Sequence, residues 1–263
     1  MSVSDPWNPA QYAKFLRERE QPFHDLLALV KARDAMRIVD LGCGTGRLTA
    51  VLHERLHARE TIGLDRSPRM LDEARANARA AGLRFGEADI DAFPADGDRF
   101  DLIFSNAALQ WVEHHERLFA RLCAALRPGG QIAVQMPAMH DDPSHTIAAE
   151  LIAIEPYRSA SGGWERSQPV LAPEEYARLL YALGFPDPAV RLIVYPHLLA
   201  AAGEVVEWMK GTLLAEYSRH LPPDLLDAFV DDYRQRVLAR FGDARPFLFP
   251  FKRILLWGQR TDA

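Results

Sequence analysis

A glycine-rich turn between a predicted strand and a predicted helix constrains the fold of this chain most. Residues 37–41 form an apolar run typical of a buried strand, and Gly42-Cys43-Gly44-Thr45-Gly46 follows directly. A predicted helix begins at Arg47. Glycines allow a tight turn and let backbone N–H groups approach a ligand with no Cβ in the way. The turn therefore predicts an α/β sheet that binds a ligand at this edge.

The alternation of strands and helices continues along the chain. Further strands are predicted at residues 61–65, 83–88, 100–105, 131–136, 191–197 and 251–258. One helix is introduced by Ser67 and Pro68, and another spans residues 115–126 and is stopped by Pro128-Gly129-Gly130. Strands that alternate with helices predict a doubly wound, parallel sheet.

We expect one domain over residues 1–263. Residues 1–35 are predicted to form helices, divided by Pro22, that cap a cofactor, and residues 36–138 form the cofactor-binding core. The segments 139–189 and 200–250 are predicted helical insertions, the second with two amphipathic helices. Insertions at the carboxyl edge of such a sheet lie over the ligand and act as a lid.

The composition excludes several classes of partner. The net charge of −5 and pI near 6.0 provide no positive field for nucleic acid or anionic membranes. Cys43 and Cys123 are expected to be free thiols in a reducing compartment, and we expect a cytoplasmic protein without a signal peptide. His114 and His115 lack partners at metal-ligand spacing, so we expect solvated histidines and no metal.

Three acids lie at the ends of three successive predicted strands and indicate the ligand. Asp65 is placed to accept hydrogen bonds from ribose hydroxyls, and Asp89 suits the exocyclic amine of adenine with Ile90 against the ring. Asp40 is placed to fix the turn or to reach the amino group of a methionine moiety. Each acid alone is equally well explained as a helix cap or turn residue. Together they favour S-adenosylmethionine.

A dinucleotide is the competing ligand for such a turn. The dinucleotide fingerprint needs a glycine or alanine where this chain has Arg47. No hydride-transfer constellation is recognisable either, which disfavours a dehydrogenase.

With these residues, the chain resembles the class I S-adenosylmethionine-dependent methyltransferases, and within them the trans-aconitate 2-methyltransferase family. The matching segments are Trp7-Asn8-Pro9 with Tyr12, Phe15, Glu18-Arg19 and Pro22; residues 40–44; residues 65–70; Phe104 to Trp111; and Ala133 to Pro137. The resemblance covers the whole chain and is strongest over residues 7–137. It implies a Rossmann-like, mostly parallel seven-stranded sheet with an antiparallel last strand and helical lid insertions.

The resemblance implies methyl transfer from S-adenosylmethionine to one carboxylate of a small unsaturated tricarboxylate, with S-adenosylhomocysteine as the second product. A carboxylate is ionised near neutral pH, so no general base is required and no catalytic residue is predicted. Alignment of the reacting atoms and exclusion of water would supply the rate.

Two sets of site residues are expected. The cofactor-binding set is Tyr12, Asp40, Gly42, Gly44, Gly46, Asp65, Arg66, Met70, Asp89, Ile90, Asn106 and Leu109. Guanidinium groups and aromatic walls suit an anionic acceptor, which gives Trp7, Arg19, Trp111, Tyr157, Arg158, Trp208 and Arg245, with Arg166, Arg253 and Trp164 as further candidates. An arginine in an insertion is more often solvated, and a tryptophan is more often in a core.

Two alternatives stay open at this point. A methyltransferase for an amine, phenol or carbon would need a base or a pocket without converging arginines. A module that only binds the cofactor would be a sensor. The sequence does not determine the oligomeric state, the range of acids or the carboxylate that is methylated.

Overall fold

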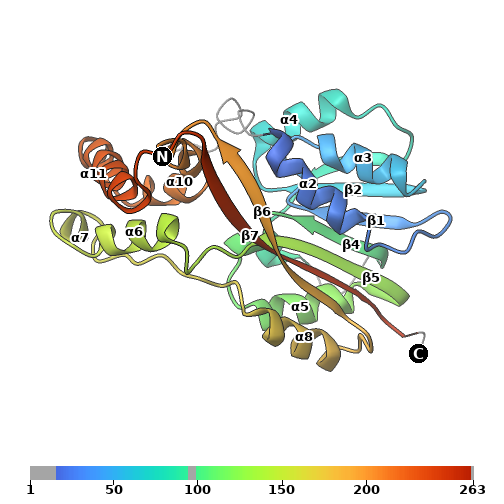
Figure 1. The fold of residues 1–263 in the computed structure, drawn as a ribbon. Helices are drawn as coiled ribbons and strands as arrows, with labels where there is room; N and C mark the ends of the chain where they lie inside the picture. The colour runs from blue at the N-terminus through green and yellow to red at the C-terminus, as the bar shows by residue number, and fades with distance from the viewer. Residues whose placement is uncertain (1–15, 94–98, 262–263) are drawn as a thin grey trace. The chain divides into compact units, whose positions relative to one another are not determined.

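The computed structural model describes residues 16–93 and 99–261, and its centre is one mixed sheet (Figure 1). The strands are β1 (Arg37–Leu41), β2 (Glu60–Asp65), β3 (Leu83–Glu87), β4 (Phe100–Asn106), β5 (Leu126–Pro137), β6 (Ala189–Leu199) and β7 (Phe247–Gln259). Their order is β3-β2-β1-β4-β5-β7-β6, with β1 to β5 parallel and β7 antiparallel to β5. The predicted fold class is confirmed.

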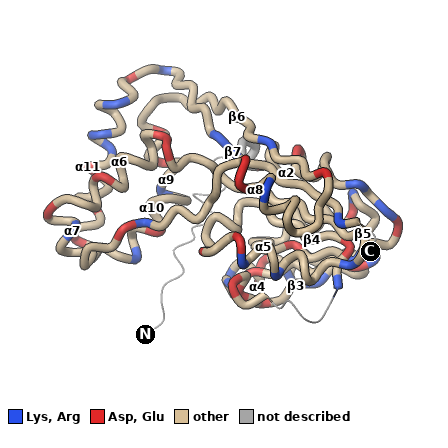
Figure 2. The backbone as a smooth tube through the Cα atoms, turned by 90° about the horizontal axis from the view of Figure 1, so that it is seen from below, with Lys and Arg blue, Asp and Glu red and all other residues tan. Residues whose placement is uncertain are grey.

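The helices fall between these strands. They are α2 (Leu16–Leu27), α3 (Arg47–Arg55), α4 (Pro68–Asn77), α5 (His115–Ala124), α6 (Pro143–Ile152), α7 (Tyr157–Ala160), α8 (Pro173–Ala182), α9 (Glu204–Lys210), α10 (Leu213–Tyr217) and α11 (Pro223–Phe241), with short 3₁₀ turns η1 (Ile90–Ala92) and η2 (Leu109–Trp111). Among the described residues, no helix is long and apolar enough to cross a membrane. Figure 2 shows acidic and basic residues interspersed along the described chain.

The chain divides into two compact units. Unit 2 comprises residues 21–138, 169–193 and 253–263, and unit 1 comprises residues 1–20, 139–168 and 194–252. The helical insertions predicted from the sequence contribute most of unit 1, and β6 and β7 have residues in both units. The predicted lid role of these insertions stays a prediction.

Both faces of the unit 2 sheet are covered, which explains the continuous apolar runs in its central strands β1 and β4. On one face, α2 and α3 pack against β1, β4, β5 and β7 through Phe23, Leu52 and Phe104. On the other face, α5 and α8 pack against the sheet through Phe119 and Tyr176. Figure 1 shows the two helical layers on opposite sides of the strands.

Unit 1 has a separate aromatic core. Tyr157, Tyr217 and Phe229 pack together, with Tyr157 edge-on to Phe229 and Tyr217 stacked on it. The hydroxyl of Tyr233 donates to the carbonyl of Ser144 at 2.7 Å and joins α11 to α6. The predicted apolar face of α11 is confirmed at Phe229, Tyr233 and Val237, which are fully buried.

Three local predictions were wrong. Pro22 lies inside α2 rather than dividing it, and the neighbouring Phe23, Leu26 and Leu27 are buried, so core packing holds the helix through the proline. Strand β5 begins at Leu126, so Pro128-Gly129-Gly130 lies within the strand and not in a break. The segment 203–240 contains three helices instead of two, α9, α10 and α11.

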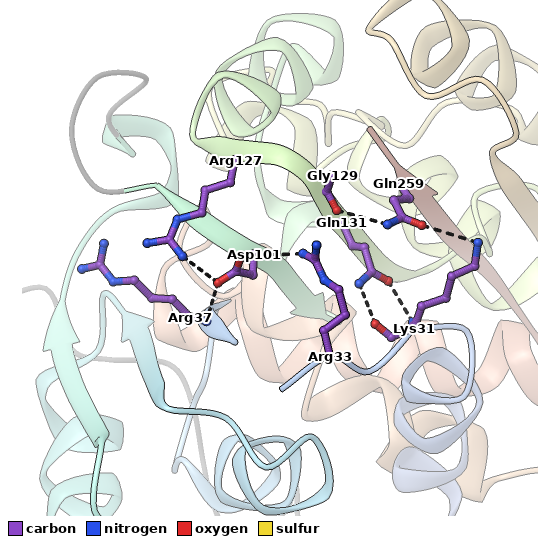
Figure 3. A network of polar contacts seen from close by, with 8 residues as sticks. All are labelled: Lys31, Arg33, Arg37, Asp101, Arg127, Gly129, Gln131 and Gln259. Atoms are coloured by element: carbon purple, nitrogen blue, oxygen red, sulfur yellow. Dashed lines mark hydrogen bonds and ion pairs between the residues drawn. The ribbon is translucent and has the colours of Figure 1, made fainter. Parts of the chain in front are cut away.

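A network of polar contacts lies at the amino ends of the parallel strands, at the opposite edge of the sheet from the glycine turn (Figure 3). Asp101 accepts hydrogen bonds from the backbone N–H of Arg37 at 2.8 Å and from the Arg127 guanidinium at 2.9 Å. The side-chain amide of Gln131 exchanges two hydrogen bonds of 2.8 Å with the backbone of Lys31. These contacts satisfy buried polar groups and have a structural role.

Candidate functional site

The glycine turn is held against the carboxyl end of β2. The backbone N–H groups of Gly42 and Cys43 both donate to the carbonyl of Leu64, at 2.8 and 3.0 Å. Gly42 has φ +78°, and a Cβ built on it would lie 2.2 Å from the Cβ of Ala108. This position therefore accepts only glycine, because both its backbone conformation and its space exclude a side chain.

Gly44 is the open position of the turn. Its φ is +54°, and a Cβ built there would meet no atom of the described residues within 4 Å, so these residues leave space beside its backbone. Its N–H donates to Oδ2 of Asp65 at 2.9 Å, and Oδ1 of Asp65 accepts from the backbone N–H of Ser67 at 2.9 Å. The Asp65 carboxylate thus joins the glycine turn to the start of α4. Each oxygen keeps a lone pair for a ligand.

Asp40 is a buried acid directly before the turn. Oδ2 of Asp40 accepts a hydrogen bond from the Thr49 hydroxyl at 2.6 Å, which ties the end of β1 to α3. Burial, with a smaller contribution from the Asp65 charge, raises the pKa of Asp40 to about 7. A cationic ligand near the turn would stabilise the ionised form.

Some of the other predicted cofactor residues lie close to this turn. Gly46 begins α3 with φ +72°, Met70 donates its backbone N–H to the Ser67 hydroxyl at 3.4 Å, and Arg66 is exposed. Ile90 lies 3.9 Å from the Cβ position of Gly42 and is half-buried. Asp89 is exposed and caps η1 by accepting from the N–H of Asp91 at 3.0 Å.

Asn106, Leu109 and Trp111 follow the end of β4. Asn106 is half-buried, and its Oδ1 is fully buried without a hydrogen-bond partner. Leu109 is completely buried in the core, whereas Trp111 is partly exposed. An unpaired buried amide oxygen at this edge is suited to receive a donor from a ligand.

The predicted acceptor residues lie in different environments. Tyr157 and Trp208 are buried in the unit 1 core, and the Tyr157 hydroxyl donates to Asp232 at 2.6 Å, which favours a structural role for both. Arg158 and Arg245 are exposed. Trp7 and Tyr12 lie outside the described residues, and Arg19 belongs to α2 but its side chain is not described.

The other candidates are spread over both units. Arg166 forms an ion pair with Glu216 at 2.7 Å, and Trp164 stacks on His220 with ring centroids 3.9 Å apart. Arg253 is 4% exposed and donates to Oε1 of Gln135 at 3.5 Å. A role in acceptor binding stays a prediction for each of these residues.

The expectation that His115 is solvated was wrong. His115 is 1% exposed, and its Nε2 lies 2.9 Å from the carbonyl of Leu109 while its Nδ1 contacts the Tyr176 hydroxyl. Burial lowers the pKa of His115, so the ring is neutral. Cys43 and Cys123 are free thiols, as predicted. Burial raises the pKa of both thiols, that of Cys123 to about 12.

Sequence reasoning missed two polar residues near the turn and the β5 edge. Thr49 was not predicted as a site residue. Its hydroxyl, at the third position of the helix that follows Asp40 and the glycine turn, could have indicated a hydrogen bond to that acid. Gln135 was noted only as part of a family motif, and its burial beside Arg253 depends on contacts distant in sequence.

The site as a whole is acidic and lies at the switch point of the sheet. In the strand order, β1 and β4 are neighbours whose connections leave in opposite directions, and ligands bind at the carboxyl ends of such strands. Asp40 and Asp65 provide negative charge, the turn provides close backbone approach, and Asn106 provides an unpaired amide. This arrangement suits a ligand with a positive charge and hydroxyl groups.

Comparisons with known proteins agree with these features. Residues 38–130 match a family described as a methyltransferase domain. The chain is 40% identical to the trans-aconitate 2-methyltransferase of Deinococcus radiodurans, over 97% of this chain and 99% of that protein. It is 40% identical to the protein of the same name from Paracidovorax citrulli (97% and 98%) and 39% identical to that from Streptomyces coelicolor (99% and 89%).

Similar solved structures show the same fold. The YcgJ protein of Bacillus subtilis has a TM-score of 0.60 at 17% identity, with 93% of this chain and all of that chain covered. Phosphoethanolamine N-methyltransferase 2 of Haemonchus contortus, solved with phosphomonomethylethanolamine and S-adenosylhomocysteine, has a TM-score of 0.57 at 16% identity, with 92% and 53% covered.

Proposed function

The chain belongs to the trans-aconitate 2-methyltransferase family, and from this premise we propose that it transfers the methyl group of S-adenosylmethionine to a carboxylate of trans-aconitate or a closely similar tricarboxylate. The product is a monomethyl ester, and the cofactor leaves as S-adenosylhomocysteine. The observation that carries the proposal is near-full-length similarity together with an acidic glycine turn at the switch point of the sheet.

The residues of the turn fit S-adenosylmethionine. Asp65 is proposed to hold the ribose hydroxyls, since each of its oxygens keeps a free lone pair after its backbone contact. Gly44 borders the open space in which a ligand approaches the backbone. Asp40 is proposed to face the ammonium group, because a buried carboxylate with a raised pKa gains most from a nearby cation.

When bound, the cofactor supplies a methyl group on a positively charged sulfur. The chain has to align an acceptor carboxylate with that methyl group and to keep water away. No general base is proposed, because a carboxylate is already ionised near neutral pH. Asn106, at the end of β4, is proposed to help orient the ligands through its unpaired amide oxygen.

Further parts of the proposal concern setting and partners. A small anionic carboxylate is the proposed acceptor. Nucleic acid is not proposed as a partner, because the net charge of −5 does not favour binding to a polyanion. The free thiols Cys43 and Cys123 suit a reducing compartment, which supports a cytoplasmic location. Tyr12, Trp7 and Arg19 are proposed ligand contacts from the family signature.

The test is transfer of labelled methyl from S-adenosylmethionine to a panel of acids, amines and phenols, with trans-aconitate among the acids. We expect label in trans-aconitate and none in amines or phenols. Label only in an amine or phenol would refute the acceptor class. Tight cofactor binding with no transfer to any compound would favour a sensor over an enzyme.

A further inference from the structure

Two glutamines on β5 share one face of the sheet but differ in their surroundings. Gln131 and Gln135 are four residues apart, so their side chains point to the same side of the strand, and both are 0% exposed. This is the face that α2 and α3 cover, since Ala133, between the two glutamines, lies in the core with Phe23 and Leu52. Because both side chains are equally buried, a difference in their hydrogen-bond partners cannot be explained by burial alone.

Gln131 has a partner for every part of its amide. Its Oε1 accepts from the backbone N–H of Lys31 at 2.8 Å, and its Nε2 donates to the Lys31 carbonyl at 2.8 Å (Figure 3). Its Oε1 also accepts from the Trp257 indole at 3.0 Å. These contacts satisfy the backbone after α2 and an indole in the core. Gln131 is therefore a structural residue.

Within the described residues, Gln135 has a partner for its amide oxygen but none for its amide nitrogen. Its Oε1 accepts from the Arg253 guanidinium at 3.5 Å, which fixes the orientation of the amide, and its Nε2 is buried with no hydrogen-bond partner among residues 16–93 and 99–261. A buried donor without an acceptor costs stability that a methionine of similar size would avoid. This cost is explained if a ligand supplies the missing acceptor.

The surroundings of Gln135 indicate what that ligand is. Asn106 pairs with Gln135 across β4 and β5, so their side chains are neighbours on the same face, and Asn106 is partly exposed at the end of β4. Arg253 on β7 lies opposite Pro137, diagonal to Gln135, and is 4% exposed. The unpaired Nε2 donor of Gln135 beside a buried guanidinium suits a carboxylate.

We propose that Gln135, with Arg253, holds a carboxylate of the acceptor that is not methylated. The assignment rests on the proposed function, because it takes a polycarboxylate as the acceptor. Hydrogen bonds to a guanidinium and an amide withdraw charge from a carboxylate oxygen and make it a weaker nucleophile, so the carboxylate held here is a spectator. Gln135 is thus a specificity-determining residue for acids with more than one carboxylate.

The experiment compares Gln135→Met with the matched control Gln131→Met in the full-length chain. Four quantities are measured: the Tm, the Kd for S-adenosylhomocysteine by calorimetry, the KM for trans-aconitate, and the Kd for trans-aconitate in the presence of S-adenosylhomocysteine. For Gln135→Met we expect KM and Kd for trans-aconitate to rise roughly ten- to hundredfold, with an unchanged cofactor Kd and a Tm equal to or above that of the wild type. For Gln131→Met we expect a lower Tm and an unchanged KM.

A second variant separates charge from size. Gln135→Glu retains an oxygen for Arg253 and adds a negative charge that repels a carboxylate, so its KM should exceed that of Gln135→Met. An unchanged trans-aconitate KM and Kd in Gln135→Met would overturn the assignment while the proposed function stands. Weaker binding of S-adenosylhomocysteine alone would overturn it too, in favour of a cofactor contact. If the wild type esterifies no acid, the proposed function itself fails.

Discussion

Cofactor affinity should depend on the ionisation of Asp40. Its pKa is raised to about 7, chiefly by burial, so the carboxyl of the free protein is half protonated near neutral pH. The ionised form attracts the cofactor ammonium, and the protonated form does not. Affinity should therefore increase as pH rises through 7 and level off above it.

The magnitude follows from that pKa. The ionised fraction is about a tenth at pH 6 and about nine tenths at pH 8, so affinity should rise about tenfold over this range, or about 1.4 kcal/mol. At about pH 6 most Asp40 side chains of the free protein are protonated and ionise when the cofactor binds. Binding should therefore release close to one proton per site at this pH. At pH 8 proton release from Asp40 should be nearly absent.

The assay is calorimetric titration with S-adenosylhomocysteine, in buffers of different ionisation enthalpy, against wild type and Asp40→Asn. The variant keeps an acceptor for the Thr49 hydroxyl but does not titrate. The ligand amino group titrates identically with both proteins, so the ratio of their affinities isolates Asp40. A ratio that stays constant from pH 6 to pH 8 would refute this account of Asp40.

Three further substitutions test the site and the core. Gly42→Ala places a Cβ against Ala108 in a left-handed conformation, so cofactor binding should weaken by at least about tenfold, as calorimetry would show; wild-type affinity would contradict the steric argument. Asp65→Ala should also weaken cofactor binding by about tenfold or more, and an unchanged Kd would remove Asp65 from the site. His115→Leu should cost about 2 kcal/mol in urea unfolding, since it removes a buried hydrogen-bond partner from both the Tyr176 hydroxyl and the Leu109 carbonyl. The free energy of unfolding of the wild type also depends on the lowered pKa of His115. This contribution is present above pH 6.5 and is lost as the pH falls below it. The His115→Leu variant should lack this loss of stability at low pH, and the same pH dependence in variant and wild type would contradict the argument.

Local sequence patterns sufficed for the central strands. The apolar runs that predict β1, β2 and β4 belong to strands covered on both faces, and their observed bounds differ from the predicted ones by a residue at most. The glycine turn was equally predictable from the sequence. Gly42 and Gly46 are required because a Cβ at these positions would collide with Ala108 and Phe85 in the strand-turn-helix unit. A pattern set by neighbours in sequence can be predicted from sequence.

Predictions failed where distant contacts decide. Pro22 is held inside α2 by core packing that local propensity does not include. His115 is buried because Tyr176, 61 residues later, covers it. Gln131 and Gln135 look alike in sequence. The Gln131 amide is satisfied by the backbone of Lys31, 100 residues away, and by the Trp257 indole, whereas Nε2 of Gln135 is not satisfied within the described residues.

The acceptor site was the least predictable part for the same reason. Tyr157 and Trp208 were chosen as residue types suited to an acid and a pocket wall. Both are buried in the unit 1 core, and their role in acceptor binding stays a prediction. Residue type does not distinguish a pocket wall from a core side chain, since both need the same apolar surface. Burial and an unsatisfied donor, which identify Gln135, are properties of the fold alone.

The most direct test of the proposed function is the chemical identity of the product formed from trans-aconitate. Wild-type protein, S-adenosylmethionine and trans-aconitate should yield a product one methylene heavier than the acid, which mild base converts back to trans-aconitate and methanol. A base-stable methylated product, or methylation of the acid at carbon, would contradict carboxyl esterification.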